Sequence, residues 1–249
     1  MAKLLLIPNT LDLGCDPVAL DEVLPRGVMV QAARLEYWVA EDAKTARAFL
    51  KRVSQSEPLA RPLQELHIRE LPRPAKGGRA APGRSEWEEL LQPLAQGHDM
   101  GLISEAGLPA VADPGSVLVA QAHAMGATVM PLSGPNSMVL ALAASGLQGQ
   151  SFAFVGYLPQ DAAARAVRLR ELQTRSRREG QTQLLIETPY RNAAVMAALL
   201  EHLDPQTRLS VACGVTLPQG WCRTARVEQW RRAVPAFDKG VPAVFAFLA

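Results

Sequence analysis

Apolar runs and amphipathic stretches alternate along the chain, most clearly in its middle third. An apolar run at 100–104 leads through a turn rich in small residues into a helical pattern that ends near Met125. A second run at 128–132 leads through another such turn into a helical pattern that ends at Gly146. Repeated strand–loop–helix units are typical of a parallel sheet with right-handed crossovers. The pattern therefore predicts an α/β fold.

The same alternation extends to both ends of the chain and restarts after Gly149. Further strands are expected at 4–7, 28–31, 37–40, 152–155, 183–186, 209–212 and 243–248. Further helices are expected at 43–53, 85–95, 161–179 and 192–203. We predict two α/β domains, 1–148 and 149–249, with mostly parallel or mixed sheets.

Capping residues mark the predicted helix starts. Asp42 precedes one helix, and Asp113 followed by Pro114 has the order of an N-cap and a first helical residue. Ser85 and Glu88 have the spacing of a capping box. From Pro72 to Arg84 the chain is rich in Pro, Gly and Arg, which predicts a mobile loop.

Composition narrows the class of protein without assigning a function. The 249 residues are 48% hydrophobic and 20% charged, with a net charge of +2, which does not by itself indicate nucleic-acid binding. The three cysteines have no metal-binding spacing and suit a reducing compartment, and the four histidines are scattered, so we expect no metal site. The first apolar run is too short for a signal or membrane segment. We expect a cytoplasmic protein with no membrane contact.

Two connections have the composition of ligand-binding loops. Residues 104–115 and 133–137 each follow a strand, contain small residues and lead into a helix. Small residues let a ligand approach the main chain, and the free N–H groups of a helix start can bind a carboxylate. The sequence lacks the dinucleotide GxGxxG, the phosphate-binding GxxxxGK[ST] and the hydrolase GxSxG. Ordinary β–α connections remain the alternative interpretation of both segments.

Several segments together resemble one family. Residues 101–115, GLISEAGLPAVADPG, resemble the SDAGTPLISDPG signature of the ribosomal RNA small-subunit ribose methyltransferase I family, within the tetrapyrrole methylases. Residues 131–137, PLSGPNS, are similar to its PLPGPSA loop. Further similar segments, in the family's order, are AED at 40–42, ASGL at 144–147, FVGYLP at 154–159 and ETPYR at 187–191.

The resemblance implies an S-adenosylmethionine-dependent methyltransferase that acts on the ribose 2′-hydroxyl of ribosomal RNA. It also implies a homodimer, a two-domain fold with a ligand cleft between the domains, and the small ribosomal subunit or RNA as partner. Main-chain groups are expected to provide most donor contacts. Motif matching places these contacts at Pro8, Leu108, Val111, Gly134, Pro135, Asn136, Ser137 and Thr188.

The chain also departs from the family pattern. Its N-terminal loop, PNTLDLG at 8–14, stands where the family has a sequence like TPIGNLGD, and so lacks one glycine. Leu108 replaces the threonine of AGTP, and ACGVTLP at 212–218 replaces a segment like ARELTK. A methyltransferase of a tetrapyrrole or other small molecule, or a non-catalytic donor-binding homologue, therefore stays open as an alternative.

Methyl transfer to a hydroxyl also needs a proton acceptor. Glu105 and Glu41 are the leading candidates, because each follows a predicted strand. Asp42 and Glu187 are weaker candidates, since Asp42 is a predicted helix cap and Glu187 has the spacing to pair with Arg191.

Two basic segments have the charge to bind RNA phosphates. One is the loop between Arg61 and Arg84. The other is the predicted helix at 161–179, with arginines at 165, 168, 170, 175, 177 and 178. A solvated charged helix face is the alternative interpretation.

Overall fold

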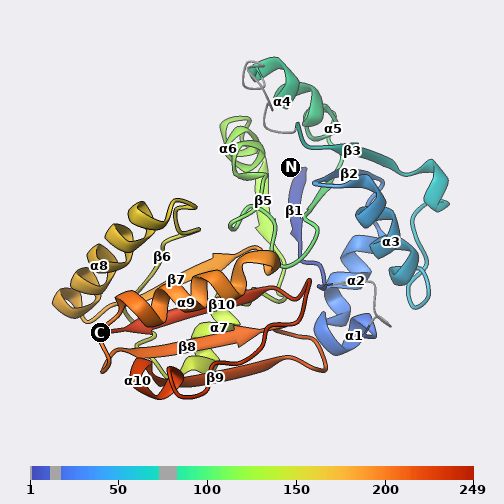
Figure 1. Cartoon of the computed structure of the whole chain (residues 1–249). Coiled ribbons are helices and arrows are strands. Elements are labelled where there is room, and N and C mark those ends of the chain that lie inside the picture. Colours follow the sequence, from blue (N-terminus) through green and yellow to red (C-terminus); the bar gives the residue numbers. More distant parts are fainter. Residues whose placement is uncertain (1, 12–17, 73–82) are drawn as a thin grey trace. The chain divides into compact units, whose positions relative to one another are not determined.

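The computed structural model describes residues 2–11, 18–72 and 83–249. The chain divides into two compact units, Met1–Pro135 and Asn136–Ala249. Each unit contains a five-stranded sheet with helices packed against it (Figure 1). The predicted α/β class with parallel and mixed sheets is confirmed.

The first unit is built on a fully parallel sheet with the order β3-β2-β4-β1-β5. β1 lies between β4 and β5, with Ile7 opposite Ile103 and Leu6 opposite Pro131. The carboxyl ends of these three strands therefore meet at one edge. The strands are β1 (Lys3–Ile7), β2 (Tyr37–Ala40), β3 (His67–Glu70), β4 (Met100–Ile103) and β5 (Thr128–Pro131).

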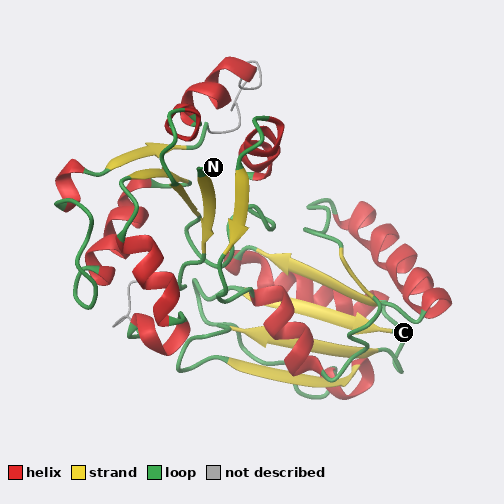
Figure 2. Cartoon of the chain, turned by 180° about the vertical axis from the view of Figure 1, so that it is seen from behind, coloured by secondary structure: helices red, strands yellow, loops and turns green. Residues whose placement is uncertain are grey.

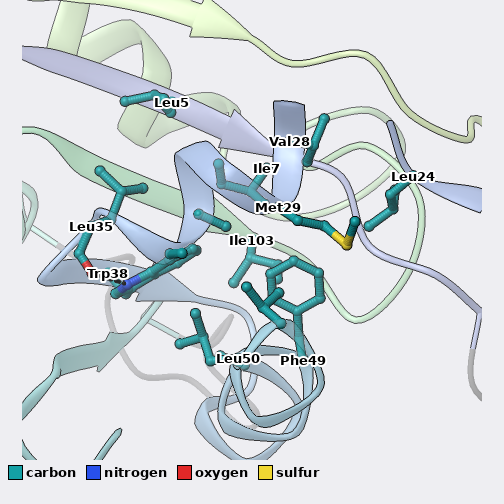
Figure 3. Packing of buried hydrophobic residues seen from close by; sticks show 14 of the residues in the cluster. Leu5, Ile7, Leu24, Val28, Met29, Leu35, Trp38, Phe49, Leu50 and Ile103 are labelled. Carbon is teal, nitrogen blue, oxygen red and sulfur yellow. Dashed lines mark hydrogen bonds between the residues drawn. The ribbon is translucent and has the colours of Figure 1, made fainter. Parts of the chain in front are cut away.

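Helices cover both faces of this sheet. Figure 3 shows one face, where Trp38, Phe49, Leu50 and Ile103 pack with Met29 in a buried cluster. A second cluster lies on the other face, which α4, α5 and α6 cover. The helices are α1 (Leu20–Val23), α2 (Arg26–Ala33), α3 (Ala43–Val53), η1 (Leu63–Glu65), α4 (Arg84–Leu90), α5 (Gln92–Ala95) and α6 (Ser116–Ala124).

The second unit has a mixed sheet with the order β6-β7-β10-β8-β9. Only β6 and β7 pair in parallel, and the other neighbours are antiparallel. The strands are β6 (Phe152–Phe154), β7 (Thr182–Glu187), β8 (Arg208–Cys213), β9 (Trp221–Arg226) and β10 (Ala243–Leu248). The helices are α7 (Ser137–Ser145), α8 (Ala162–Glu179), η2 (Pro189–Arg191), α9 (Asn192–His202) and α10 (Val227–Trp230).

The second sheet is covered on both faces. Leu142 of α7 packs in a cluster with Leu184 and Val244, whereas the neighbouring Leu185 and Phe245 point to the other face. α9 is drawn in front of the sheet and α7 behind it in Figure 1, and Figure 2 shows the reverse side. α7 thus belongs to the core of the second unit.

This packing moves the division between the units. The boundary was expected near Gly149, but the observed division falls between Pro135 and Asn136. The restart of the strand pattern after Gly149 marks β6, the first strand of the second sheet. It does not reveal that the preceding helix already packs on that sheet.

Hydrogen bonds confirm the predicted N-cap Asp42 and show two further N-caps, Asp161 and Asn136, that the sequence did not identify as caps. The Asp42 side chain accepts from the Thr45 N–H at 2.7 Å, and Asp161 caps α8 through Ala164. Asn136 caps α7 by accepting from the Val139 N–H at 3.1 Å.

Other local predictions were wrong. The segment 28–31 lies in helix α2 instead of a strand, because Val28, Met29, Ala32 and Ala33 form one buried helical face. An apolar run of four residues fits either state, and tertiary packing decides between them. The sequence also missed β3 and β9, whose side chains are mostly exposed and so lack an apolar pattern. β3 lies within the segment between Arg61 and Arg84 that was expected to be a loop.

Asp113 and Pro114 do not begin a helix. α6 starts at Ser116 with Gly115 at its N-cap, so the expected start lies two residues too early. α4 starts at Arg84 with Gly83 as its N-cap, so Ser85 is within the first turn and no side chain caps the helix. The helix expected to continue to Ala95 is two helices, α4 and α5.

Two further predictions concern a mobile loop and the absence of a membrane segment. The loop expected from Pro72 falls, over residues 73–82, outside the described residues. Within the described part of the chain, no helix has the length and apolar character needed to cross a membrane.

Candidate active site

Three connections meet at the carboxyl edge of the first sheet, which is where parallel α/β sheets bind ligands. The chain leaves β1 at Pro8, leaves β4 through residues 104–115 and leaves β5 through residues 132–135. We call the second of these the β4–α6 loop. The topology therefore brings the predicted contacts Pro8, Leu108 and Gly134 to one edge.

The first of these connections is joined to the β4–α6 loop by backbone pairing. The Asn9 N–H donates to the Gly107 carbonyl, and the Gly107 N–H donates to the Asn9 carbonyl, both at 2.9 Å. The Asn9 side-chain amide adds bonds to the carbonyls of Glu105 at 3.0 Å and Ser104 at 3.3 Å. The end of β1 thus extends the sheet into the loop.

The first and third connections touch at Gly134. A Cβ atom at Gly134 would lie 2.3 Å from both Cβ and Cγ of Pro8, which no packed structure allows. Gly134 is therefore required for the close approach of the two turns. The predicted contacts Pro8 and Gly134 are neighbours.

The backbone of the β4–α6 loop is strained. Ala110 and Ala112 have φ angles of 65° and 63°, and Gly107 and Gly115 also have positive φ. A left-handed alanine costs about 1–2 kcal/mol relative to an ordinary conformation. Leu108 is half-buried and Val111 is 39% exposed, so this loop presents apolar side chains beside its main chain. Strain of this kind is concentrated at functional sites.

Carboxylates surround the start of the loop. Glu41, which follows β2, accepts a hydrogen bond from the Glu105 N–H at 3.1 Å through Oε2. Burial of Asp113, together with the nearby charges of Glu41 and Glu105, raises its pKa to about 6, although a hydrogen bond with Ser104 acts in the opposite direction. The fold thus gathers Glu41, Glu105 and Asp113 in one negatively charged region.

Of these three acids, Asp113 was not predicted from the sequence. Its position before Pro114 indicated a helix cap, so Asp113 was not considered as a member of a group of carboxylates. Glu41 and Glu105 could be predicted because each closely follows a strand of the parallel sheet. Asp113 lies at the far end of a long loop, so its distance from a strand gives no such indication.

The two weaker proton-acceptor candidates have structural roles. Asp42 caps α3. Glu187 has a side chain only 1% exposed, forms an ion pair with Arg191 at 3.2 Å and accepts from the Thr188 N–H at 2.8 Å. Its bonds hold the turn that follows β7.

Of the remaining predicted contacts, Pro135 is the last residue of the first unit and the others lie in the second unit. Asn136 is the N-cap of α7, Ser137 is the exposed first residue of that helix, and Thr188 follows β7. The next turn of α7 exposes Val139 and Leu140, at 56% and 38%. Pro135 closes the turn that precedes them.

No metal site accompanies these groups in the described ranges, where no set of three or more His, Cys, Asp or Glu side chains is arranged to hold an ion.

Comparison with solved structures defines the class of protein. The fold is similar to that of the methyltransferase CobJ, with a TM-score of 0.58, 17% identity and coverage of 98% of this chain and 92% of that one. Uroporphyrin-III-C-methyltransferase from Thermus thermophilus matches with a TM-score of 0.50, 17% identity and coverage of 100% and 94%. The chain is thus an α/β protein with the two-domain fold of these methyltransferases.

The chain belongs to the Tetrapyrrole (Corrin/Porphyrin) Methylases family, whose model matches residues 31–228. It is 32% identical to the ribosomal RNA small subunit methyltransferase I of Pseudomonas aeruginosa over 205 residues, 82% of this chain and 65% of that protein. The protein of the same name from Xylella fastidiosa is 31% identical, over 77% of this chain and 63% of its own length. The chain spans less than two thirds of the length of these relatives.

Gly134→Ala is expected to destabilise the protein by about 1–3 kcal/mol, because the new methyl group overlaps Pro8. Urea unfolding measures the change. Gly149→Ala is the matched control, since a Cβ there meets nothing within 4 Å and the effect should stay within about 0.5 kcal/mol. Equal stability of the two variants would contradict the close approach of the turns.

Asp113→Asn is expected to stabilise the protein by about 1 kcal/mol at pH 7.5 and to leave it unchanged below pH 4. The folded-state pKa of Asp113 is about 6 against an ordinary value of 3.8, so the folded wild type binds a proton more tightly than the unfolded chain does. Wild-type stability therefore falls, relative to the variant, as pH rises through that window. Unfolding midpoints of both proteins across this range test the prediction, and a pH-independent difference would contradict it.

Proposed function

We propose that this protein is an S-adenosylmethionine-dependent methyltransferase and that the donor binds at the carboxyl edge of the first sheet. The convergence of the β1, β4 and β5 connections, joined by the Asn9–Gly107 pairing, carries this proposal. Membership of the tetrapyrrole methylases and similarity to proteins named as methyltransferases support it.

The chemistry of this edge suits the donor. S-adenosylmethionine carries a positive sulfonium, and Glu41, Glu105 and Asp113 supply negative charge nearby. Apolar Leu108 and Val111 lie beside exposed main chain that can bind the polar groups. The proposed contacts of the first unit are Pro8, Leu108, Val111, Gly134 and Pro135, and those of the second unit are Asn136, Ser137 and Thr188.

Each acid has a proposed task in the reaction. The bound donor supplies the methyl group, and transfer requires the acceptor oxygen to be held in line with it. Glu41 holds the loop through the Glu105 N–H. Glu105 and Asp113 are the proposed proton acceptors for a hydroxyl, and the pKa of Asp113, about 6, leaves it ionised at neutral pH.

We propose ribosomal RNA of the small subunit as the acceptor, with its ribose 2′-hydroxyl as the methylated atom. The relatives named ribosomal RNA small subunit methyltransferase I match most of this chain at 31–32% identity, whereas the solved methyltransferases are 17% identical. Charge supports the same acceptor. Residues 136–249 contain 13 Arg and Lys against 8 Asp and Glu, whereas residues 1–135 contain 13 against 16.

Helix α8 is the proposed contact for RNA phosphates. Its solvent face has a shallow groove of about 490 Å³. Three arginines, Arg170, Arg175 and Arg178, line it together with Val167, Thr174 and one acid, Glu171. Arg175 and Arg178 also contact Glu179. Exposed ion pairs contribute at most about 1 kcal/mol, so these arginines can exchange their partner for phosphate.

Two alternatives define the tests. A tetrapyrrole or other small-molecule acceptor is favoured by the structural neighbours, and predicts donor binding without RNA binding. A non-catalytic homologue predicts donor binding without methyl transfer. The homodimer that the family implies and action in the cytoplasm, where ribosomal subunits are found, are part of the same proposal.

Ser137→Trp is expected to weaken binding of S-adenosylmethionine by at least about tenfold, because the indole fills space beside the proposed donor contacts at the start of α7. Calorimetric titration of both proteins measures the affinity. Ser85→Trp is the control, since Ser85 is likewise an exposed serine in the first turn of a helix. Unchanged affinity in Ser137→Trp would place the donor elsewhere, and no binding to the wild type would remove the methyltransferase proposal.

Replacing Arg170, Arg175 and Arg178 by Gln is expected to weaken binding of small-subunit RNA and to lower the slope of log K against log salt by about 1 for each phosphate that the variant no longer binds. Binding isotherms at several salt concentrations measure this slope. The control replaces Lys44, Arg47 and Lys51, three exposed cations of α3, by Gln. An equal loss of RNA affinity in both triple variants would show that only the net charge of the protein matters, and it would contradict RNA binding at α8.

A further inference from the structure

The Asn9 side chain makes three hydrogen bonds at the carboxyl edge of the first sheet. The residue is 4% exposed and lies two residues beyond the end of β1. Its main chain exchanges two hydrogen bonds with Gly107, and its amide nitrogen donates to the carbonyls of Ser104 and Glu105. One residue thus fastens the segment 104–107 of the β4–α6 loop.

The chemistry of its neighbours fixes the orientation of the Asn9 amide. Nδ2 faces two carbonyl oxygens, which can only accept, whereas Oδ1 lies 2.9 Å from the Thr10 N–H, which can only donate. Both protons and one oxygen lone pair are therefore used. Aspartate has the same shape but would turn a carboxylate oxygen toward two carbonyl oxygens.

Other hydrogen bonds act on the same segment. The Ser104 hydroxyl donates to the Ala106 carbonyl at 3.0 Å, and Ser104 also forms a hydrogen bond with Asp113. Residues beyond Gly107 pass through left-handed Ala110 and Ala112, a backbone that relaxes unless its surroundings restrain it. Glu41 adds one bond, to the Glu105 N–H, from a neighbouring strand. Asn9 supplies four bonds, all from a residue that lies inside the N-terminal loop where this sequence departs from the family pattern.

The geometry points to Asn9 as the positioning residue of the β4–α6 loop, setting the place of Leu108 and Val111 for the methyl donor. This inference rests on the proposed function, because it assigns the loop to donor binding. Asn9 acts through the loop and is not a catalytic residue. A residue that only stabilised the fold would lower the stability of the protein without changing donor affinity at temperatures where the protein is folded.

Asn9→Ala tests the amide while leaving the backbone bonds to Gly107 possible. Loss of two buried donor bonds is expected to weaken the affinity for S-adenosylmethionine about tenfold or more. Amide exchange at Glu105 and Gly107 should accelerate by a similar factor, with β2 and β3 unchanged. Asn9→Asp should lower the affinity for S-adenosylmethionine at least as much as Asn9→Ala does, although aspartate keeps the volume of the side chain.

The matched control is Thr182→Val, which removes another buried side chain-to-carbonyl bond, from Thr182 Oγ1 to Gln148, at the start of β7. It should lower the melting temperature by a comparable amount and leave donor affinity within about twofold. Donor affinity within twofold of the wild type in Asn9→Ala, its restoration in Asn9→Asp, or an equal loss in Thr182→Val would each overturn the assignment.

Two measurements separate this inference from the proposed function. Absence of donor binding by the wild type overturns the proposed function and the donor-positioning role together. Normal binding by the wild type, with unaltered exchange at Glu105 and Gly107 in Asn9→Ala, overturns the role of Asn9 alone. Faster exchange confined to the loop, accompanied by weaker binding, supports both.

Discussion

Parallel pairing of β1 between β4 and β5 is the constraint on which the candidate site depends. Parallel strands all end at the same edge, so the turns that follow them are forced together however far apart they lie in the sequence. Here they are joined further by the Asn9–Gly107 pairing and by the absence of a side chain at Gly134. The site is therefore a product of topology first and of individual side chains second.

The two units differ in a way that matches a division of labour. The first has a parallel sheet, strained connections and an excess of acid, which suits a positively charged donor. The second has a mixed sheet and an excess of arginine, which suits a polyanionic acceptor. The proposed methyl transfer to RNA uses both properties, and this chain carries each of them in a separate unit.

Much of this arrangement was predictable from the sequence, and the failures have physical causes. Periodic apolar runs correctly placed most strands of both sheets, and a short polar side chain correctly placed the N-cap at Asp42. The strand predicted at 28–31 was wrong because four apolar residues fit a strand as well as a helix face. The prediction for Asp113 was wrong because capping is a local property, whereas the charge of Glu41 comes from the end of another strand and that of Glu105 from the start of the same loop. The donor contacts were carried by motifs and stay predictions.

Ala110 and Ala112 have a further consequence. Glycine at these positions would adopt the same backbone without strain, yet it would also give the unfolded chain, and a released loop, many more conformations. Alanine instead limits the loop to few conformations: a strained one that its neighbours hold in place, and a relaxed one of different shape. Small changes at the edge of the sheet can therefore shift this segment as a unit, so substitutions that never touch a ligand can still alter the shape of the proposed donor site.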